Sequence, residues 1–210
     1  MVSLIFGGKF EVKAPRPKVW EFIVVGGSAL VQAAQKLREE AKAKLGSDSS
    51  DELLKHEFDV AVFRPQNEQL NAFGANLVTA LLDESGSVRL KEIRAYYDVG
   101  RALNPSMIQS QIIGGSAQGL GQVLTEEVKY DDEGQLLTAT IADAGLTNAT
   151  AIPNVVTKLA QIPSSLPHGA KGVGESPTMG VPPAAMRAIE KLVGKRMRET
   201  PIPLELLVSN

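Results

Sequence analysis

The chain has 210 residues, of which 43% are hydrophobic, and this length and composition suit a folded protein with one large domain or two small ones. Its 22 basic and 24 acidic side chains are interspersed and leave a net charge of −2, which disfavours binding to nucleic acid or to anionic lipid. The absence of cysteine excludes disulfides, thiolate zinc sites, iron–sulfur ligation and cysteine nucleophiles within this chain, so any metal chemistry must enter on a cofactor.

The first 25 residues do not form a convincing unit. Residues 10–13 alternate like a strand, prolines interrupt the chain at Pro15 and Pro17, and an apolar run follows at 19–25. This run is far shorter than the roughly 20 residues that cross a bilayer, and no cleavage-like site follows a charged start. We therefore expect a cytoplasmic protein that does not bind membranes.

A helix is predicted from Ala29 to Leu45, because apolar residues recur there at three- and four-residue spacing among strong helix formers. Ser28 is a plausible N-cap, and Gly46 is typical of a helix end. The polar segment 47–51 predicts a solvated loop, followed by a short helix around residues 53–54.

Two β-rich runs follow, from Gly74 to Leu82 and from Val88 to Tyr97. The small and polar residues 83–87 between them suit a hairpin loop, so an antiparallel pair is predicted. Residues 105–125 have a helical pattern that contains four glycines, each costing roughly 1 kcal/mol in a helix interior. Such a helix needs a close approach of its backbone to another segment or to a ligand.

A second hairpin is predicted from residues 128–130 and 136–142, and a further short strand from Asn154 to Leu159. A last helix is predicted over residues 184–193, with Pro182 and Pro183 at its start and Gly194 beyond its end. The predicted fold class is α+β, with helices packed on a mixed or antiparallel sheet. We assign residues 26–210 to one domain and leave residues 1–25 unplaced.

The loop at residues 169–177 is the most informative stretch, because three glycines let backbone amides approach a ligand beside the carboxylate of Glu175. Taken alone, the loop also fits a solvated pair of Lys171 and Glu175 on a flexible segment. A nucleotide-binding loop is a weak alternative, because no phosphate-binding fingerprint is present. His56 and His168 lie far apart and outside any ligand-spaced cluster, as ordinary surface histidines do.

Three motifs occur in the order found in the molybdenum hydroxylases. They are Asp98-Val99-Gly100-Arg101-Ala102-Leu103-Asn104-Pro105, then the stretch from Gln111 to Gly121, then Lys171-Gly172-Val173-Gly174-Glu175. The resemblance runs from about Gly26 to Leu207. The chain therefore resembles the C-terminal part of the molybdopterin-binding large subunit of the family of xanthine dehydrogenase, aldehyde oxidoreductase and carbon monoxide dehydrogenase.

The resemblance implies roles for particular residues. In that family a glutamate at the position of Glu175 deprotonates a labile oxygen on molybdenum for attack on the substrate carbon. A carboxylate in a partly desolvated loop suits a general base. The resemblance places Gln111 beside the cofactor, where its amide both donates and accepts hydrogen bonds, although an exposed helix glutamine is the alternative. It also places Lys171, Gly172, Gly174 and Ser28 against the cofactor.

The family's large subunit is several times longer than this chain, and residues 17–25 stand where a Ser/Thr-rich cofactor-contacting stretch is usual. Ser110 also replaces a common glycine. We therefore expect a partner polypeptide that supplies the upstream part of the subunit, with iron–sulfur and FAD subunits and a dinucleotide form of the molybdenum cofactor. The stretch from Gly172 to Ala184 resembles the aldehyde and carbon monoxide members, so an aldehyde is the expected substrate. The alternative is a non-catalytic remnant or assembly module.

Overall fold

The computed structural model describes residues 5–6, 8–13, 27–53, 55–56, 58, 60–63, 72–165 and 167–207. The chain divides into two compact units. The first unit comprises residues 1–71 and 163–172, and the second comprises residues 72–162 and 173–210. Among the described helices, none has the length and apolar character needed to cross a membrane.

The first unit pairs a small sheet with one long helix. Strands β1 (Ile5–Phe6) and β2 (Gly8–Lys13) are antiparallel, and β2 pairs in parallel with β3 (Val60–Phe63). Helix α1 (Ser28–Leu45) packs beside β2 and β3 and is followed by the short α2 (Ser50–Leu53). The predicted strand at residues 10–13 and the predicted long helix are confirmed. The predicted short helix is present, but it begins at Ser50, within the segment predicted as a loop. Residue 54 lies outside the described residues.

The ends of α1 agree with the prediction at one end only. Gly46 closes the helix with a φ of 71°, a left-handed conformation that glycine adopts without steric cost. The prediction of Ser28 as N-cap was wrong, because the backbone of Ser28 is already helical, whereas an N-cap stands just outside the helix. Gly27 occupies the N-cap position, and because glycine has no side chain it cannot cap the helix with one.

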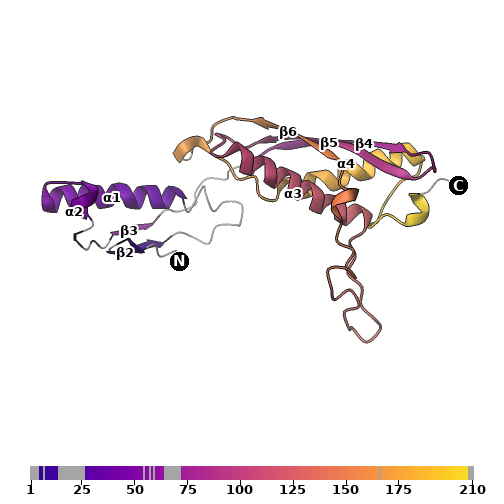
Figure 1. Ribbon diagram of the computed structural model, residues 1–210, viewed down its shortest axis with the longest axis horizontal. Coiled ribbons are helices and arrows are strands. Elements are labelled where there is room, and N and C mark those ends of the chain that lie inside the picture. Colours follow the sequence, from indigo (N-terminus) through magenta and orange to yellow (C-terminus); the bar gives the residue numbers. More distant parts are fainter. Residues whose placement is uncertain are drawn as a thin grey trace. The chain divides into compact units, whose positions relative to one another are not determined.

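The second unit is a three-stranded sheet with two helices along one face (Figure 1). Strands β4 (Gly74–Leu82) and β5 (Val88–Asp98) are antiparallel, and β6 (Asn154–Ala160) pairs in parallel with β5. Helices α3 (Pro105–Leu124) and α4 (Ser176–Val193) cover the sheet. The predicted hairpin, strand and mixed α+β arrangement are confirmed. Short 3₁₀ helices occur in this unit at Ala149–Ala151 and Leu204–Leu206, and another occurs in the first unit at Pro167–Gly169.

The turn between β4 and β5 is organised by Asp83. Its carboxylate accepts a hydrogen bond from the Ser85 hydroxyl at 2.6 Å and from the Arg89 guanidinium at 2.8 Å. The bond from Ser85 has the largest effect and that from Arg89 the next, and both hold the pKa of Asp83 well below its usual value. Gly86 completes the turn with a φ of 79°.

The core of the second unit lies between the sheet and the two helices. Alternate residues of β5 point inward, as the two-residue period of a strand requires, and α3 and α4 each present one apolar face. The principal buried side chains are Val78, Ile93, Ala95 and Tyr97 from the sheet, Ile112, Leu120 and Val123 from α3, and Val181, Ala185 and Ile189 from α4.

Helix α4 begins eight residues before the predicted start at Ala184. Pro182 and Pro183 lie inside it, not at its beginning, and Gly194 ends it with a φ of 71° as predicted. Proline at 182 cannot donate a hydrogen bond to the Thr178 carbonyl. Burial of Pro177, Val181 and Ala185 stabilises the helix in spite of this loss, which sequence propensity alone cannot show.

Two glycines of α3 allow its backbone to approach α4 closely. A Cβ on Gly115 would lie 3.0 Å from the Pro177 Cβ, and one on Gly119 would lie 3.1 Å from the Thr178 carbonyl oxygen. By contrast, no described atom lies within 4 Å of a Cβ placed on Gly114. The expectation of a close backbone approach is therefore confirmed for packing against α4.

The predicted second hairpin was wrong as a pair of strands. Between residues 128 and 142 there is a single β-bridge, from Tyr130 to Leu136. Apolar residues alternate with polar ones there, but Val128, Tyr130 and Ile141 are all strongly exposed. The segment therefore lacks the buried face against which such alternation forms a stable strand pair.

Replacing Gly119 with alanine is expected to reduce the free energy of unfolding by about 1–3 kcal/mol, because the new methyl group crowds a backbone carbonyl that cannot rotate away. The matched change Gly114→Ala should raise it by roughly 0.5–1 kcal/mol, because alanine is the better helix former where space is open. Denaturant unfolding of both variants measures the difference. Equal effects of the two changes would contradict the packing of α3 on α4.

Candidate functional site

The motif from Asp98 to Pro105 builds the connection from β5 to α3. Asp98 is buried, and its carboxylate accepts hydrogen bonds from the Gly100 amide at 3.0 Å and the Ile162 amide at 3.2 Å. Asn104 caps α3 by accepting a bond from the Met107 amide at 3.1 Å, with Pro105 in the first turn. These polar residues therefore orient α3 relative to the sheet.

Helices α3 and α4 run in the same direction where they touch. Gly115 faces Pro177 and Thr178, and Gly119 faces Thr178 and Pro182, so later residues of one helix meet later residues of the other. The Thr178 hydroxyl also donates to the Gln118 side chain at 3.4 Å. The N-terminal end of α4 consequently lies beside the middle of α3.

Glu175 occupies the residue just before α4. Its backbone carbonyl accepts a hydrogen bond from the Thr178 amide at 3.1 Å, but its side chain makes no capping bond to the helix. The side chain is exposed, so the partial desolvation expected of it is not provided by the described part of this chain. The positive end of the α4 dipole favours a carboxylate at this position.

Gln111 lies on α3 one turn before Gly115, toward the same end of the helix pair as Glu175. Its side chain is exposed, as is the backbone at Gly114 three residues later. Gln118, a further turn along, is also exposed. Helix α3 therefore presents amide groups and an open stretch of backbone on one face.

A buried tyrosine supports the first turn of α4 from the sheet side. The Tyr97 hydroxyl accepts a hydrogen bond from the Asn76 side-chain amide at 2.7 Å and donates to the Ser176 carbonyl at 3.4 Å. Burial raises the pKa of the Tyr97 hydroxyl, and the bond from Asn76 opposes that shift. A Cβ on Gly180 would overlap the Asn76 amide, so α4 needs a glycine there.

The predicted site residues fall into both units. Gln111, Gly174 and Glu175 belong to the second unit, whereas Ser28, Lys171 and Gly172 belong to the first. Lys171 and Gly172 are partly buried, and Gly174 is too. The structure brings Gln111 and Glu175 to one end of the α3–α4 pair, and the assignment of all six residues to cofactor or catalysis stays a prediction.

The arrangement at this end suits a flat, polar heterocycle. Such a ring requires hydrogen-bond donors and acceptors on its edge and an unobstructed surface beside it. Gln111 supplies both kinds of group, and no described atom fills the space over Gly114. The described residues contain no group of three His, Cys, Asp or Glu side chains able to hold a metal ion.

Sequence reasoning missed Asn76, Tyr97 and Asp98 as residues that position the site. Asn104 before Pro105 is a detectable capping signal, and Asp98 before Gly100 is a detectable turn signal. The contact between Tyr97 and Ser176 joins residues 79 positions apart, so local pattern has no means of finding it.

Comparison with known proteins identifies similar chains. A family model described as a molybdopterin cofactor-binding domain matches residues 55–153. The 6-hydroxypseudooxynicotine dehydrogenase complex subunit gamma of Paenarthrobacter nicotinovorans is 34% identical over 136 residues, which are 63% of this chain and 17% of that protein. The aldehyde oxidoreductase molybdenum-binding subunit of Escherichia coli is 35% identical over 127 residues, which are 59% of this chain and 17% of that protein.

Solved structures agree in fold. The reconstituted CO dehydrogenase from Oligotropha carboxidovorans has a TM-score of 0.68 and 24% identity, and the match covers 85% of this chain and 27% of that one. The chain spans only part of these proteins, since the match to each of the two relatives named above covers 17% of the relative's length.

Replacing Tyr97 with phenylalanine is expected to lower the free energy of unfolding by about 1–3 kcal/mol, because the Asn76 amide loses its acceptor inside the protein. Its neighbour Tyr96 is half-exposed on the other face of β5, so Tyr96→Phe should change stability by less than about 0.5 kcal/mol. Denaturant unfolding measures both. A neutral Tyr97→Phe would show that the hydroxyl does not support α4.

Proposed function

We propose that the chain is part of a molybdopterin-binding subunit of a molybdenum hydroxylase, and that it supplies the general base and one wall of the cofactor pocket of such an enzyme. Its similarity to a molybdopterin cofactor-binding domain and to subunits of such enzymes supports this. The supporting observation is the close packing of α3 on α4. It places three groups at one end of the helix pair. They are the exposed amide of Gln111, the open backbone at Gly114 and the carboxylate of Glu175, which makes no capping bond.

The cofactor would be held by polar side chains and backbone of this chain. Gln111 would bond to the cofactor with its side-chain amide, and the open backbone at Gly114 would lie against it. Gly174 would add backbone contacts, and the resemblance assigns similar contacts to Lys171, Gly172 and Ser28. When bound, the molybdenum cofactor accepts the two electrons released as the substrate carbon gains an oxygen derived from water.

Glu175 would act as the general base that takes up the proton of this water-derived oxygen. The side chain is exposed, stands just before the first turn of α4 and makes no capping bond to that helix, which suits a group that takes up a proton. Tyr97 fixes the Ser176 carbonyl next to it, which limits movement of the base. Other parts of the subunit would exclude water from around Glu175.

The proposed substrate is an aldehyde, and the proposed partners are the rest of the enzyme. The stretch from Gly172 to Ala184 resembles the aldehyde and carbon monoxide members of the family, and one relative is named an aldehyde oxidoreductase. Because the chain covers so little of its relatives, we propose that an upstream large-subunit polypeptide completes the pocket. Iron–sulfur and FAD subunits would carry the electrons away, and the cofactor would be a dinucleotide form.

A non-catalytic remnant is the competing function. A remnant would keep the buried core but would have no need of an exposed Gln111 and Glu175 beside an open glycine. The named relatives are subunits of oxidoreductases, which does not favour that alternative.

Replacing Glu175 with glutamine is expected to reduce aldehyde turnover of the assembled enzyme by about 10²–10⁴-fold, because the amide keeps the shape of the side chain but cannot accept the proton. Molybdenum and pterin content should be unchanged. Steady-state kinetics and metal analysis on the complex measure the two quantities.

Glu133→Gln is the matched control for this change, since Glu133 is an exposed carboxylate in the 131–135 turn, remote in sequence from α4. It should leave both turnover and metal content unaltered. Full activity of Glu175→Gln would show that Glu175 is not the general base. Loss of the cofactor in this variant would show that Glu175 contributes to cofactor binding instead.

Replacing Gln111 with alanine is expected to lower the cofactor content of the assembled enzyme, because an amide that bonds to the pterin is lost. Gln109 is exposed on the same helix but is rotated away from the Gln111 and Gly114 face. Gln109→Ala should therefore retain the cofactor. Equal pterin content in both variants would exclude Gln111 from the pocket wall.

A further inference from the structure

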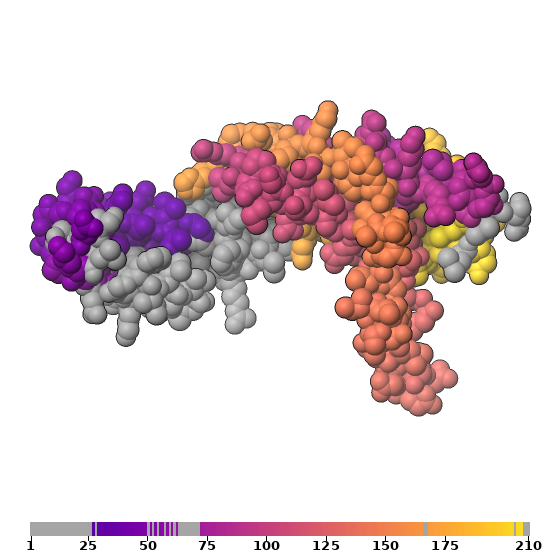
Figure 2. Space-filling model, in the orientation of Figure 1, coloured from indigo at the N-terminus to yellow at the C-terminus, as the bar shows by residue number. Residues whose placement is uncertain are grey.

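Residues 126–148 form an arm that leaves the end of α3 and projects from the second unit (Figures 1 and 2). Its two legs are joined by hydrogen bonds from the Glu127 amide to the Ala144 carbonyl at 3.1 Å and from the Leu137 amide to the Lys129 carbonyl at 2.8 Å. At its tip, the Asp131 carboxylate accepts a bond from the Gln135 amide at 2.7 Å. The arm is therefore held in shape by these hydrogen bonds and a single β-bridge, from Tyr130 to Leu136.

The arm exposes an unusual amount of apolar surface. Five large apolar side chains along it are each more than half exposed, namely Val128, Tyr130, Leu137, Ile141 and Leu146. Single exposed apolar residues are ordinary, but a group of this size on one projecting segment is typical of a surface that another polypeptide covers.

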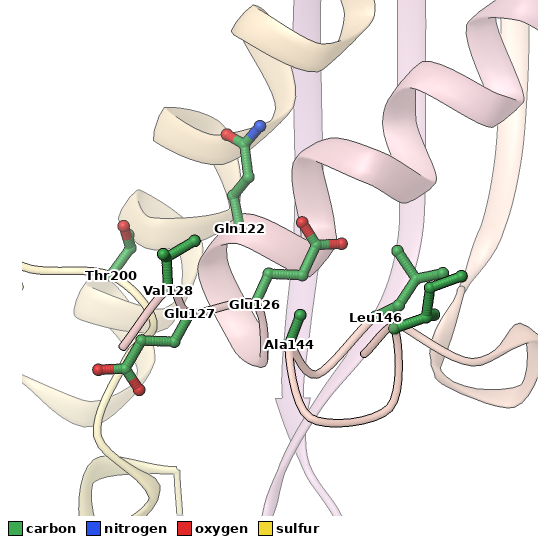
Figure 3. Close-up of a pocket in the computed structure, with 8 residues that line it drawn as sticks. Gln122, Glu126, Glu127, Val128, Ala144, Leu146 and Thr200 are labelled. Atoms are coloured by element: carbon green, nitrogen blue, oxygen red, sulfur yellow. The ribbon is translucent and has the colours of Figure 1, made fainter. Parts of the chain in front are cut away.

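A pocket of about 420 Å³ lies at the base of the arm (Figure 3). Its wall is partly apolar, with Val128, Ile141 and Leu146, and partly acidic, with Glu126 and Glu127. Glu126 lies on the side of Ala144 and Leu146, whereas Glu127 points to the other side of the segment that leaves α3. The pocket thus combines apolar contacts with a carboxylate.

The Glu126 carboxylate is the unusual group in this pocket. Its Oε1 atom is buried and finds no hydrogen-bond partner among the described residues. It lies against Gly121 in the last turn of α3, where the helix dipole disfavours a negative charge. A buried carboxylate oxygen in this position is costly unless a donor approaches it, and a cation satisfies both the charge and the hydrogen bond.

The charge of the arm also favours a basic partner. Residues 126–148 include six carboxylate side chains and one basic side chain, that of Lys129. Lys129 pairs with Glu127 at 2.8 Å, which leaves Glu126 without this cation. An arginine or lysine offers the required donors on an apolar stem that suits the aliphatic wall.

We infer that the arm docks onto the part of the large subunit that this chain does not span, and that a basic side chain of that polypeptide enters the pocket beside Glu126. The identity of the polypeptide rests on the proposed function. The charge, the buried carboxylate oxygen and the exposed apolar groups of the arm are features of this chain and do not depend on the proposed function. The match to the Escherichia coli relative covers 17% of that protein, so most of a large subunit lies outside the matched stretch.

The pocket is tested first with a small probe. Titration of the methyl-labelled full chain with n-butylguanidinium should shift the Val128, Ile141 and Leu146 methyl signals in NMR spectra and reach saturation. Binding should weaken about tenfold in Glu126→Gln, because a charge-assisted hydrogen bond is lost. It should be unchanged in Glu84→Gln, since Glu84 is exposed in the β4–β5 turn outside the arm. Absence of shifts, or an equal response to uncharged 1-pentanol, would overturn the basic occupant.

The polypeptide is tested by coexpression of the full chain with the Escherichia coli aldehyde oxidoreductase molybdenum-binding subunit, trimmed of its matching stretch. Copurification is expected, and Glu126→Lys should reduce the recovered partner at least about tenfold. Glu84→Lys should not, because Glu84 is an exposed carboxylate in the β4–β5 turn, outside the arm. Glu126→Gln serves where the lysine variant fails to fold. Lack of a complex, equal recovery in both lysine variants, or a dimer of this chain that Glu126→Lys dissociates would overturn the inference.

The same preparation separates this inference from the proposed function. A complex that depends on Glu126 but contains no molybdenum or pterin would refute the proposed function and leave the docking surface in place. A loaded, active complex that is indifferent to Glu126 would refute the docking surface and leave the proposed function in place.

Discussion

The second unit depends on the close contact of α3 with α4. At Gly115 and Gly119 the backbone of α3 lies where side chains would otherwise separate the helices, and the ring of Pro182 fills part of that contact. The glycines therefore cost helix stability but fix the register of the two helices. This register places the N-terminal end of α4, which begins directly after Glu175, near the part of α3 that carries Gln111.

The sheet holds α4 from the opposite side with polar groups in place of a further apolar layer. Tyr97 bonds to the Ser176 carbonyl, and Asn76 lies so close to Gly180 that no side chain fits between them. The first turn of α4 is thus restrained by α3 and by β4 and β5. Glu175 stands one residue outside this restrained turn, so its side chain is exposed while its backbone is held.

The sequence predicted the elements whose stability is local or follows one period. Helix α1, the β4–β5 hairpin, β6 and the glycine at 194 are of this kind. The start of α4 was misplaced because two prolines resemble a helix start, and only burial of Pro177 and Val181 shows that the helix precedes them. Alternation at residues 128–142 resembled a hairpin because sequence does not reveal whether a buried face exists. The ordered motifs led to the prediction of Gln111 and Glu175 as site residues, whereas the role of Tyr97 in holding α4 is evident only from a long-range contact.

The exposure of the remaining apolar groups bears on how a base could work here. Met107 on α3 and Met179, one turn after Glu175, are strongly exposed near the end of the helix pair that carries the proposed site. A carboxylate surrounded by water is a weak base, because water both competes for its hydrogen bonds and screens nearby charges. If Glu175 is the base that we propose, a polypeptide that covers these methionines would also remove water from around its carboxylate and so strengthen it as a base.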